Sequence, residues 1–237
     1  MNIIIIGATS GIGRALYEKY AEQENRLGIV GRRANLLEEL SRQHPGNTIT
    51  ATADITKQTE IGQAIHSLKK QLGSIDLAIV CAGTGEINNS LDYSIELPTI
   101  ETNITGWTFV VNRIYKIFEK QGHGHLAAIT SVGGLRGEHN APAYSASKAY
   151  QINYMEALRK KAFKSGGNIT ITEIRPGLVD TAMAKGDGLF LLMPVEKVAK
   201  QISVAIRKRK SKAYVTRRWH YLAFIVKNLP FTVFKRM

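Results

Sequence analysis

The feature that most constrains the fold of this chain is its first unit, in which an apolar run leads through a glycine-rich turn into a helical pattern. Residues 2–6 read N-I-I-I-I, which suits a central strand buried on both faces. The next residues, G-A-T-S-G-I-G-R, place glycines at positions 7, 11 and 13. Glycines let the backbone approach a phosphate, and a helix N-terminus favours negative charge. The unit predicts a pyrophosphate site, although its spacing is not the commoner G-x-G-x-x-G and a simple tight turn is the alternative.

Apolar runs that read as strands recur along the chain and alternate with helical stretches. Strands are expected near residues 2–7, 26–31, 48–53, 75–81, 125–131, 169–175 and 213–216. Helices are expected around residues 11–23, 34–43, 57–71, 96–120, 142–164 and 195–208. This alternation predicts an α/β fold with a single Rossmann-type, doubly wound parallel sheet of about seven strands and helices on both faces. A chain of 237 residues is long enough for one such domain.

A hydroxyl, a phenol and an ammonium are spaced so that they could serve a carbonyl group. Tyr144 and Lys148 lie four residues apart in A-Y-S-A-S-K, thirteen residues after Ser131. In a helix over residues 142–164 the pair would share one face. A free tyrosine has a pKa of about 10, and a neighbouring ammonium favours the phenolate and moves that pKa toward neutral pH. The pattern indicates a proton-donating site, while on an exposed helix it would be two solvated side chains.

Taken together, these motifs resemble the short-chain dehydrogenase/reductase family in its compact form of about 250 residues. The resemblance covers about residues 2–216 and adds Asp54, V-C-A-G at 80–83, Asn103 and R-P-G-L-V-D-T at 175–181. The chain departs from the family where Ile6 replaces a usual Thr and where Cys81 replaces a usual Asn. Both positions mainly support the turn and the sheet. The resemblance therefore implies a nicotinamide-dependent oxidoreductase that transfers hydride between a cofactor and a carbonyl.

The resemblance also implies a role for each matching residue. Catalysis is expected from Ser131, which polarises the carbonyl oxygen, from Tyr144, which donates the proton, and from Asn103 and Lys148, which complete a proton relay through a water. Asp54 and Ile55 should flank the adenine, and residues 176–181 should cover the nicotinamide. The residues expected to bind the cofactor are Gly7, Thr9, Ser10, Gly11, Ile12, Gly13, Arg14, Arg32, Arg33, Asp54, Ile55, Ala82, Gly83, Tyr144, Lys148, Pro176, Gly177, Val179 and Thr181.

Basic residues at the end of the second strand bear on which cofactor is preferred. A carboxylate there holds the ribose hydroxyls of NAD, whereas a basic residue accommodates the 2′-phosphate of NADP. Here the strand ends in L-G-I-V-G-R-R, and no Asp or Glu occurs between Asn25 and Leu37. Arg32 and Arg33 therefore favour NADP(H), with Arg14 close enough to help. The alternative is that the arginines only solvate the start of the next helix.

The sequence says less about the substrate than about the cofactor. Residues 184–194, A-K-G-D-G-L-F-L-L-M-P, occupy the place of the family's substrate lid, with Gly186 and Gly188 as possible hinges and residues 189–193 as an apolar cover. An ordinary hydrophobic helix on the core is an equal alternative. Leu135, Arg136, Glu138 and His139 are expected to border the cleft. These residues favour an apolar pocket; an apolar or lipid-linked carbonyl is the substrate expected if the C-terminal tail contacts a membrane.

The C-terminus carries most of the net charge. From Arg207 onward there are ten Lys or Arg residues and no Asp or Glu, so this part supplies +10 of the formal +13. Residues 219–234 are apolar and rich in aromatics, and are too short to span a bilayer. We expect a catalytic domain over residues 1–216 and a basic, apolar tail over 217–237. The tail favours peripheral contact with an anionic membrane, with a subunit interface or nucleic acid as alternatives; no nucleic-acid recognition motif accompanies it.

The numbers and positions of cysteines and histidines bear on disulfides, cellular compartment and metal binding. One cysteine excludes an intrachain disulfide framework and fits a reducing, cytoplasmic compartment. Cys81 reads as a small buried residue, and the scattered histidines predict no metal site. We expect no signal peptide, because the first strand begins at residue 2. The resemblance implies a homodimer or homotetramer. A non-catalytic NADP-binding sensor or scaffold with the same fold is the alternative function.

Overall fold

The computed structural model describes residues 1–184 and 191–236, which form an α/β fold around one parallel sheet. The sheet has seven strands in the order β3-β2-β1-β4-β5-β6-β7. Their bounds are β1 Asn2–Ile6, β2 Arg26–Gly31, β3 Thr48–Thr52, β4 Leu77–Val80, β5 Gly124–Ile129, β6 Ile169–Pro176 and β7 Lys212–Val215. The prediction of a doubly wound parallel sheet is confirmed, with every strand within two or three residues of its expected position.

The first strand lies in the interior of the sheet, third in the order of seven. Residues 3–6 of β1 are at most 1% exposed, and the strand pairs with β2 on one side and β4 on the other. Successive side chains of a strand point to opposite faces, so an unbroken apolar run can satisfy both layers only in a sheet covered on both sides.

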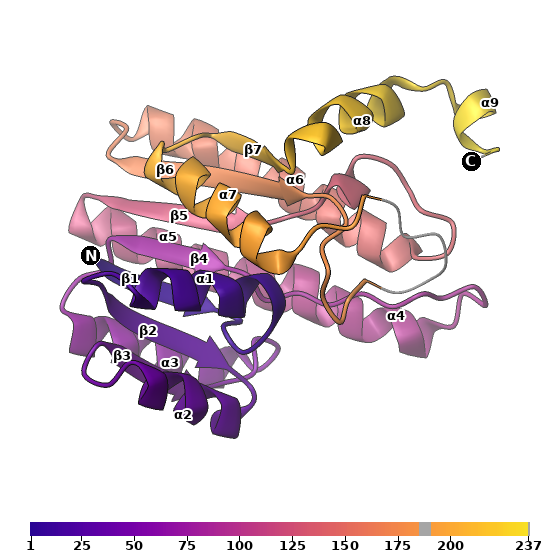
Figure 1. The fold of residues 1–237 in the computed structure, drawn as a ribbon. Helices are drawn as coiled ribbons and strands as arrows, with labels where there is room; N and C mark the ends of the chain where they lie inside the picture. The colour runs from indigo at the N-terminus through magenta and orange to yellow at the C-terminus, as the bar shows by residue number, and fades with distance from the viewer. Residues whose placement is uncertain (185–190, 237) are drawn as a thin grey trace.

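Helices cover both faces of the sheet (Figure 1). On one face lie α1 (Gly11–Ala21), α2 (Ala34–Gln43) and α7 (Val195–Arg207), whose side chains share one core with β1 and β2. On the other face lie α3 (Gln58–Leu72), α5 (Trp107–Gln121) and α6 (Pro142–Lys164). Trp107, Phe118 and Met155 are fully buried in this second core. The helices of both layers run antiparallel to the strands. The carboxyl ends of the strands, which lead into the helices, therefore all lie at one edge of the sheet.

The helix expected over residues 96–120 is divided in the structure. It consists of α4 (Tyr93–Ile100), a π-helical segment η1 (Glu101–Gly106) and α5. Pro98 lies inside α4, where a proline removes one backbone hydrogen bond and crowds the carbonyl one turn earlier. π-Helical turns are rare and often occur at functional sites, and this one contains Asn103.

The C-terminal segment forms helices that the sequence analysis did not predict. After β7 come α8 (Arg217–Asn228) and α9 (Phe231–Phe234), which lie on the side of the molecule toward which the strands point (Figure 1). Trp219 is buried on the inner side of α8, whereas Tyr221, Phe224 and Ile225 are exposed on its outer side. In the part of the chain that is described, no helix is long and apolar enough to cross a bilayer.

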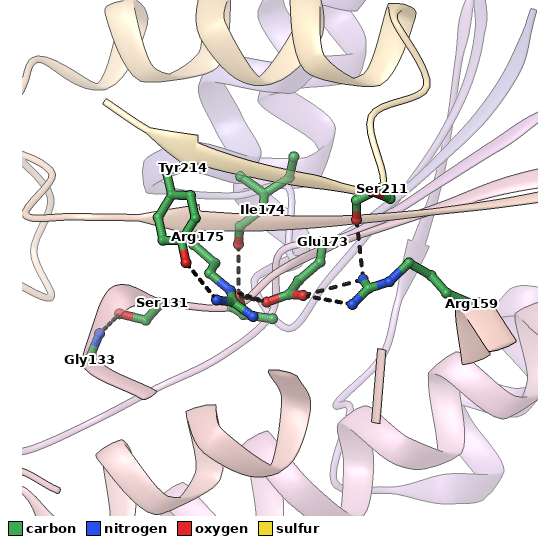
Figure 2. Close-up of polar contacts among 9 residues, drawn as sticks. Ser131, Gly133, Arg159, Glu173, Ile174, Arg175, Ser211 and Tyr214 are labelled. Carbon is green, nitrogen blue, oxygen red and sulfur yellow. Dashed lines mark hydrogen bonds and ion pairs between the residues drawn. The ribbon is translucent and has the colours of Figure 1, made fainter. Parts of the chain in front are cut away.

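A buried ionic network ties the end of β6 to its neighbours (Figure 2). The Glu173 carboxylate is fully buried and accepts hydrogen bonds from Arg159, at 3.3 Å, and from Arg175. Arg175 also donates to the Tyr214 hydroxyl of β7 at 2.8 Å. The Thr130 hydroxyl, next to Ser131, donates to Glu173 at 3.4 Å. A buried charge is tolerated because partners surround it, so the network fixes how β5, β6, β7 and α6 meet.

Replacing Glu173 with Gln should destabilise the protein by about 3–5 kcal/mol, because two buried or half-buried guanidinium groups lose their counter-charge. Urea unfolding followed by circular dichroism measures the change. Glu38→Gln is the matched control, since Glu38 forms an exposed ion pair with Arg42 and should cost less than about 1 kcal/mol. Equal unfolding midpoints for the two variants would contradict the role assigned to Glu173.

Candidate active site

The glycine turn between β1 and α1 is closed by contacts that leave no room for side chains. Gly7 has φ +89°, and a Cβ on it would lie 2.7 Å from the backbone N of Ala82. A Cβ on Gly13 would collide with the Gly7 carbonyl. The first turn of α1 therefore packs directly on the end of β1, with Ser10 as its exposed N-cap residue and Ile12 packed against the core. This is the geometry that a pyrophosphate site requires.

The loop after β6 returns to this turn. Thr181 lies 3.2 Å from the position of a Cβ on Gly11, and Gly177 donates from its backbone N to Val215 O at 2.7 Å. Val179 is buried and forms a parallel bridge with Met193. The residues expected at the pyrophosphate, 7–14, and those expected over the nicotinamide, 176–181, are thus brought together along the carboxyl edge of the sheet.

The three arginines of the expected cofactor site have different partners. Arg33 donates to the Thr9 hydroxyl at 2.8 Å, which places its guanidinium beside the glycine turn. Arg32 is exposed and lies 3.5 Å from the Asp54 carboxylate. Arg14 is held by Glu18 at 2.9 Å and Glu39 at 3.3 Å. In this structure two carboxylates already engage Arg14, whereas Arg32 and Arg33 stand at the end of β2 as the sequence predicts.

The Asp54 carboxylate accepts hydrogen bonds within its own turn and also lies beside Arg32. Burial works to raise the pKa of its carboxyl group, but hydrogen bonds from the Thr56 backbone N–H and hydroxyl, with the Arg32 charge, outweigh it and lower that pKa. Both Thr56 donors are 2.8 Å from Asp54 Oδ1. Ile55 is buried next to it, and Gly106 packs on the Ile55 carbonyl.

Ser131 and Tyr144 meet at the end of β5. Ser131 is the N-cap of a short 3₁₀ turn, η2 (Val132–Gly134), and its hydroxyl accepts from Gly133 N at 3.0 Å. The Tyr144 ring lies between Gly85, whose Cβ would collide with it, and Gly133. Burial raises the pKa of the Tyr144 phenol, and a hydrogen bond with Ser131 opposes that rise.

The sequence analysis expected Lys148 to lower the pKa of Tyr144, and in this structure the net shift has the opposite direction. The reason is that the loss of water around the phenol outweighs the effect of its neighbours. A raised pKa keeps the phenol protonated at neutral pH, which is the state that a proton donor needs.

Lys148 lies one turn after Tyr144 on α6, as the four-residue spacing predicts, and it is 5% exposed. Its Nζ donates to Ile129 O at 3.3 Å and to Gln151 Oε1 at 3.0 Å, and lies 5.8 Å from the centroid of the Tyr144 ring. Burial lowers the pKa of the ammonium to about 8. The alternative of two solvated side chains is therefore wrong for this pair.

Asn103 is held by bonds that use its whole side chain. Its Oδ1 accepts from Thr84 N at 2.9 Å, and its Nδ2 donates to Thr84 O at 2.7 Å and to Ser147 Oγ at 2.9 Å. Its backbone carbonyl accepts from Gln151 Nε2 at 2.9 Å. Gln151, Gly85 and Ser147 also contact the side chains of this site, and none of them was expected from the sequence. A glutamine three residues after the lysine, among apolar helix positions, was the signal available for Gln151.

Ala82 and Gly83 lie between the two halves of the site. Ala82 contacts Gly7, and a Cβ on Gly83 would lie 3.3 Å from Asn103 Oδ1 and 3.4 Å from Lys148 Nζ. Cys81 is partly buried and packs against the core, and burial of its thiol raises the pKa to about 12, which does not fit a nucleophile. Among the described residues no group of three or more His, Cys, Asp or Glu side chains is placed to hold a metal ion.

The expected substrate-binding segments are only partly described. Residues 185–190, which include Gly186, Gly188, Leu189 and Phe190, lie outside the described residues. Leu191 and Leu192 are partly exposed, and Met193 packs on the core in an extended pairing with residues 178–180, so this part is not helical. Leu135, Arg136 and Glu138 line a hollow of about 400 Å³ beside α6, and His139 is exposed next to Glu138.

Arg136 joins the expected cleft border to the C-terminal helices. It donates to Lys227 O at 3.3 Å and Leu229 O at 2.9 Å, and its guanidinium lies 4.4 Å from the centroid of the Phe234 ring. At the other end of α8, the Trp219 indole packs on the Gly177 backbone. The C-terminal segment therefore contacts two of the loops that border the site.

Comparisons with known proteins agree with this geometry. A family model described as short chain dehydrogenase matches residues 1–189. An uncharacterised oxidoreductase of Staphylococcus epidermidis is 30% identical over 185 residues, which cover 77% of this chain and 80% of that protein.

Solved structures share the fold at lower identity. The closed form of serine dehydrogenase, complexed with NADP+, has a TM-score of 0.82 at 22% identity and is matched over 91% of this chain and 94% of its own. A short chain dehydrogenase/reductase from Burkholderia phymatum, in complex with NAD, has a TM-score of 0.84 at 18% identity, over 95% and 92% of the two chains.

Proposed function

The chain belongs to the short-chain dehydrogenase family of oxidoreductases, and on that premise we propose that it is an NADPH-dependent carbonyl reductase that converts a ketone or aldehyde to an alcohol. The observation that carries the proposal is the group at the carboxyl edge of the sheet formed by the partly buried Ser131 and Tyr144 and the buried Lys148. This group lies across Gly83 from the glycine turn, so a dinucleotide bound along the edge would present its nicotinamide to Tyr144.

The cofactor, when bound, supplies the hydride, and the chain's own residues handle orientation and the proton. The Ser131 hydroxyl, fixed by Gly133 N, is placed to hydrogen-bond the substrate oxygen. The Tyr144 phenol, whose pKa burial raises further above neutral pH, is protonated and gives its proton to that oxygen as negative charge develops. The Lys148 ammonium then stabilises the phenolate that remains, since opposite charges attract strongly in a buried site.

Two matches in the structure support NADP(H) as the proposed cofactor. The glycine turn accepts no side chain at Gly7 or Gly13, which fits a pyrophosphate held close to the backbone. Arg33 beside Thr9, and Arg32 at the end of β2, offer guanidinium groups where the 2′-phosphate would lie. One solved relative in the fold is complexed with NADP+ and another with NAD, so the preference rests on these arginines.

Replacing Tyr144 with Phe should lower kcat for carbonyl reduction by about two to four orders of magnitude, because the general acid is removed. NADPH oxidation across a panel of ketones, sugars and acyl thioesters measures it, and fluorescence titration should show unchanged NADPH binding. Retained turnover would rule out the role of Tyr144. NADPH binding by the unaltered protein with no turnover on any carbonyl would instead favour the sensor or scaffold.

Replacing Arg32 with Asp should weaken NADPH binding by about 10- to 100-fold, since a charge-assisted contact to the phosphate is lost. NADH binding should change far less. Arg42→Asp, at another exposed arginine, is the control. Because Asp54 lies near position 32, the ratio of the two affinities decides the test, and comparable losses for NADPH and NADH would defeat the assignment.

The proposal extends to the C-terminal tail, residues 217–237, outside a catalytic domain of residues 1–216. On α8 and α9 the exposed Tyr221, Phe224, Ile225 and Phe231 lie among exposed cations. This combination fits the interface of an anionic membrane, with an apolar or lipid-linked carbonyl as substrate. We also propose that the protein forms a homodimer or homotetramer through the helices that hold Asn103 and Tyr144.

The double variant Phe224→Ser/Phe231→Ser should lose most sedimentation with phosphatidylserine vesicles, because about 2 kcal/mol of apolar burial is removed per ring. Phe163→Ser is the matched control, since Phe163 is 83% exposed on α6 and lies outside the tail. Equal sedimentation of all three proteins would exclude the membrane. Sedimentation velocity of the same samples would then show whether the tail residues hold subunits together.

A further inference from the structure

A buried glutamine joins α6, which holds Lys148, to η1, which holds Asn103. Gln151 lies on α6 three residues after Lys148, and none of its surface is exposed. Its Oε1 accepts from Lys148 Nζ at 3.0 Å, and its Nε2 donates to the backbone carbonyl of Asn103, in η1, at 2.9 Å. One side chain therefore spans the space between the ammonium and the π-helical turn, where the sequence analysis expected a water.

The orientation of the Gln151 amide follows from its two partners. An ammonium can only donate hydrogen bonds and a backbone carbonyl can only accept them, so the oxygen faces Lys148 and the nitrogen faces Asn103. If the oxygen and the nitrogen of the amide changed places, both hydrogen bonds would be lost. A buried polar side chain that makes two such bonds is fixed in place.

The surroundings of the Lys148 ammonium show why this acceptor matters. Its other acceptor is the carbonyl oxygen of Ile129 on β5. From the end of β4, Gly83 and the thiol of Cys81 face it, and Cys81 with its raised pKa stays uncharged at neutral pH. Tyr144, one turn away on α6, is also neutral there because its pKa is raised. Each group that faces the ammonium from these elements is thus uncharged, and Gln151 supplies one of its acceptors.

We propose that Gln151 is a positioning residue of the active site, which links the Lys148 ammonium to the backbone of Asn103 and keeps the ammonium charged and aimed at Tyr144. This inference rests on the proposed function, because its value to the protein is the stabilisation of the phenolate left by proton transfer. A carboxamide does this without carrying charge itself.

Removing the acceptor at position 151 and placing a negative charge there should shift the pKa of the Lys148 ammonium in opposite directions. Gln151→Leu removes the acceptor while keeping the volume, so the pKa of Lys148 should fall below its present value of about 8 by about 1. Gln151→Glu places a carboxylate there, so the pKa should rise. Gln151→Met is a second uncharged variant in case the leucine protein does not fold.

The measurement uses the protein without cofactor, so it does not depend on turnover. Lysine side chains labelled with carbon isotope are titrated by nuclear magnetic resonance from neutral to alkaline pH, and Lys148→Arg identifies the signal of Lys148. Met155→Leu, at a fully buried α6 position about one turn after Gln151, is the matched control and should leave the titration unchanged.

The same proteins are then assayed for carbonyl reduction against pH. The alkaline limb of kcat/KM, where activity falls as the ammonium loses its proton, should move to lower pH in Gln151→Leu and to higher pH in Gln151→Glu. Titrations that coincide in all variants, or that move the same way in both, overturn the inference while leaving carbonyl reduction intact. Opposite shifts in a protein that reduces no carbonyl support Gln151 and defeat the proposed function.

Discussion

The constraint on which the rest of the structure depends is the burial of β1 on both faces. Residues 3–6 can leave water only if helices cover both sides of the sheet, and parallel strands with right-handed crossovers satisfy that requirement. All strand ends that lead into helices then meet at one edge. Gly7 after β1, Gly83 after β4, Ser131 after β5 and Gly177 after β6 are neighbours for this reason, although they span most of the chain.

The chemistry at that edge depends on burial that the packing creates. Without water, the pKa of Tyr144 rises and that of Lys148 falls to about 8, so each group is pushed toward its neutral form. A hydrogen bond with Ser131 opposes that tendency at Tyr144, and the Lys148 ammonium donates to Ile129 O and Gln151 Oε1. The balance keeps a protonated phenol beside an ammonium whose charge depends on its few acceptors, which is a suitable state for donating a proton to a carbonyl.

The C-terminal segment is coupled to this site through packing. Trp219 rests on Gly177 in the loop expected to cover the nicotinamide, and Arg136, at the expected border of the cleft, donates to the Lys227 carbonyl of α8. The helices present Phe224 and Phe231 outward. A surface that engaged these rings would therefore act on loops next to the reacting group, which connects the proposed membrane contact to the proposed substrate class.

The sequence by itself determined the sheet, the glycine turn and the pair on α6. Apolar runs, glycine spacing and the four-residue separation of Tyr144 and Lys148 are local patterns, and local geometry converts them directly into strands, a turn and a shared helix face. Only the tertiary structure decided the partners: Gln151 between Lys148 and Asn103, Glu18 and Glu39 on Arg14, and the π-helical turn in a stretch that reads as ordinary helix. Such contacts depend on the angle and depth at which distant elements pack, and a pattern along the chain carries no information about either.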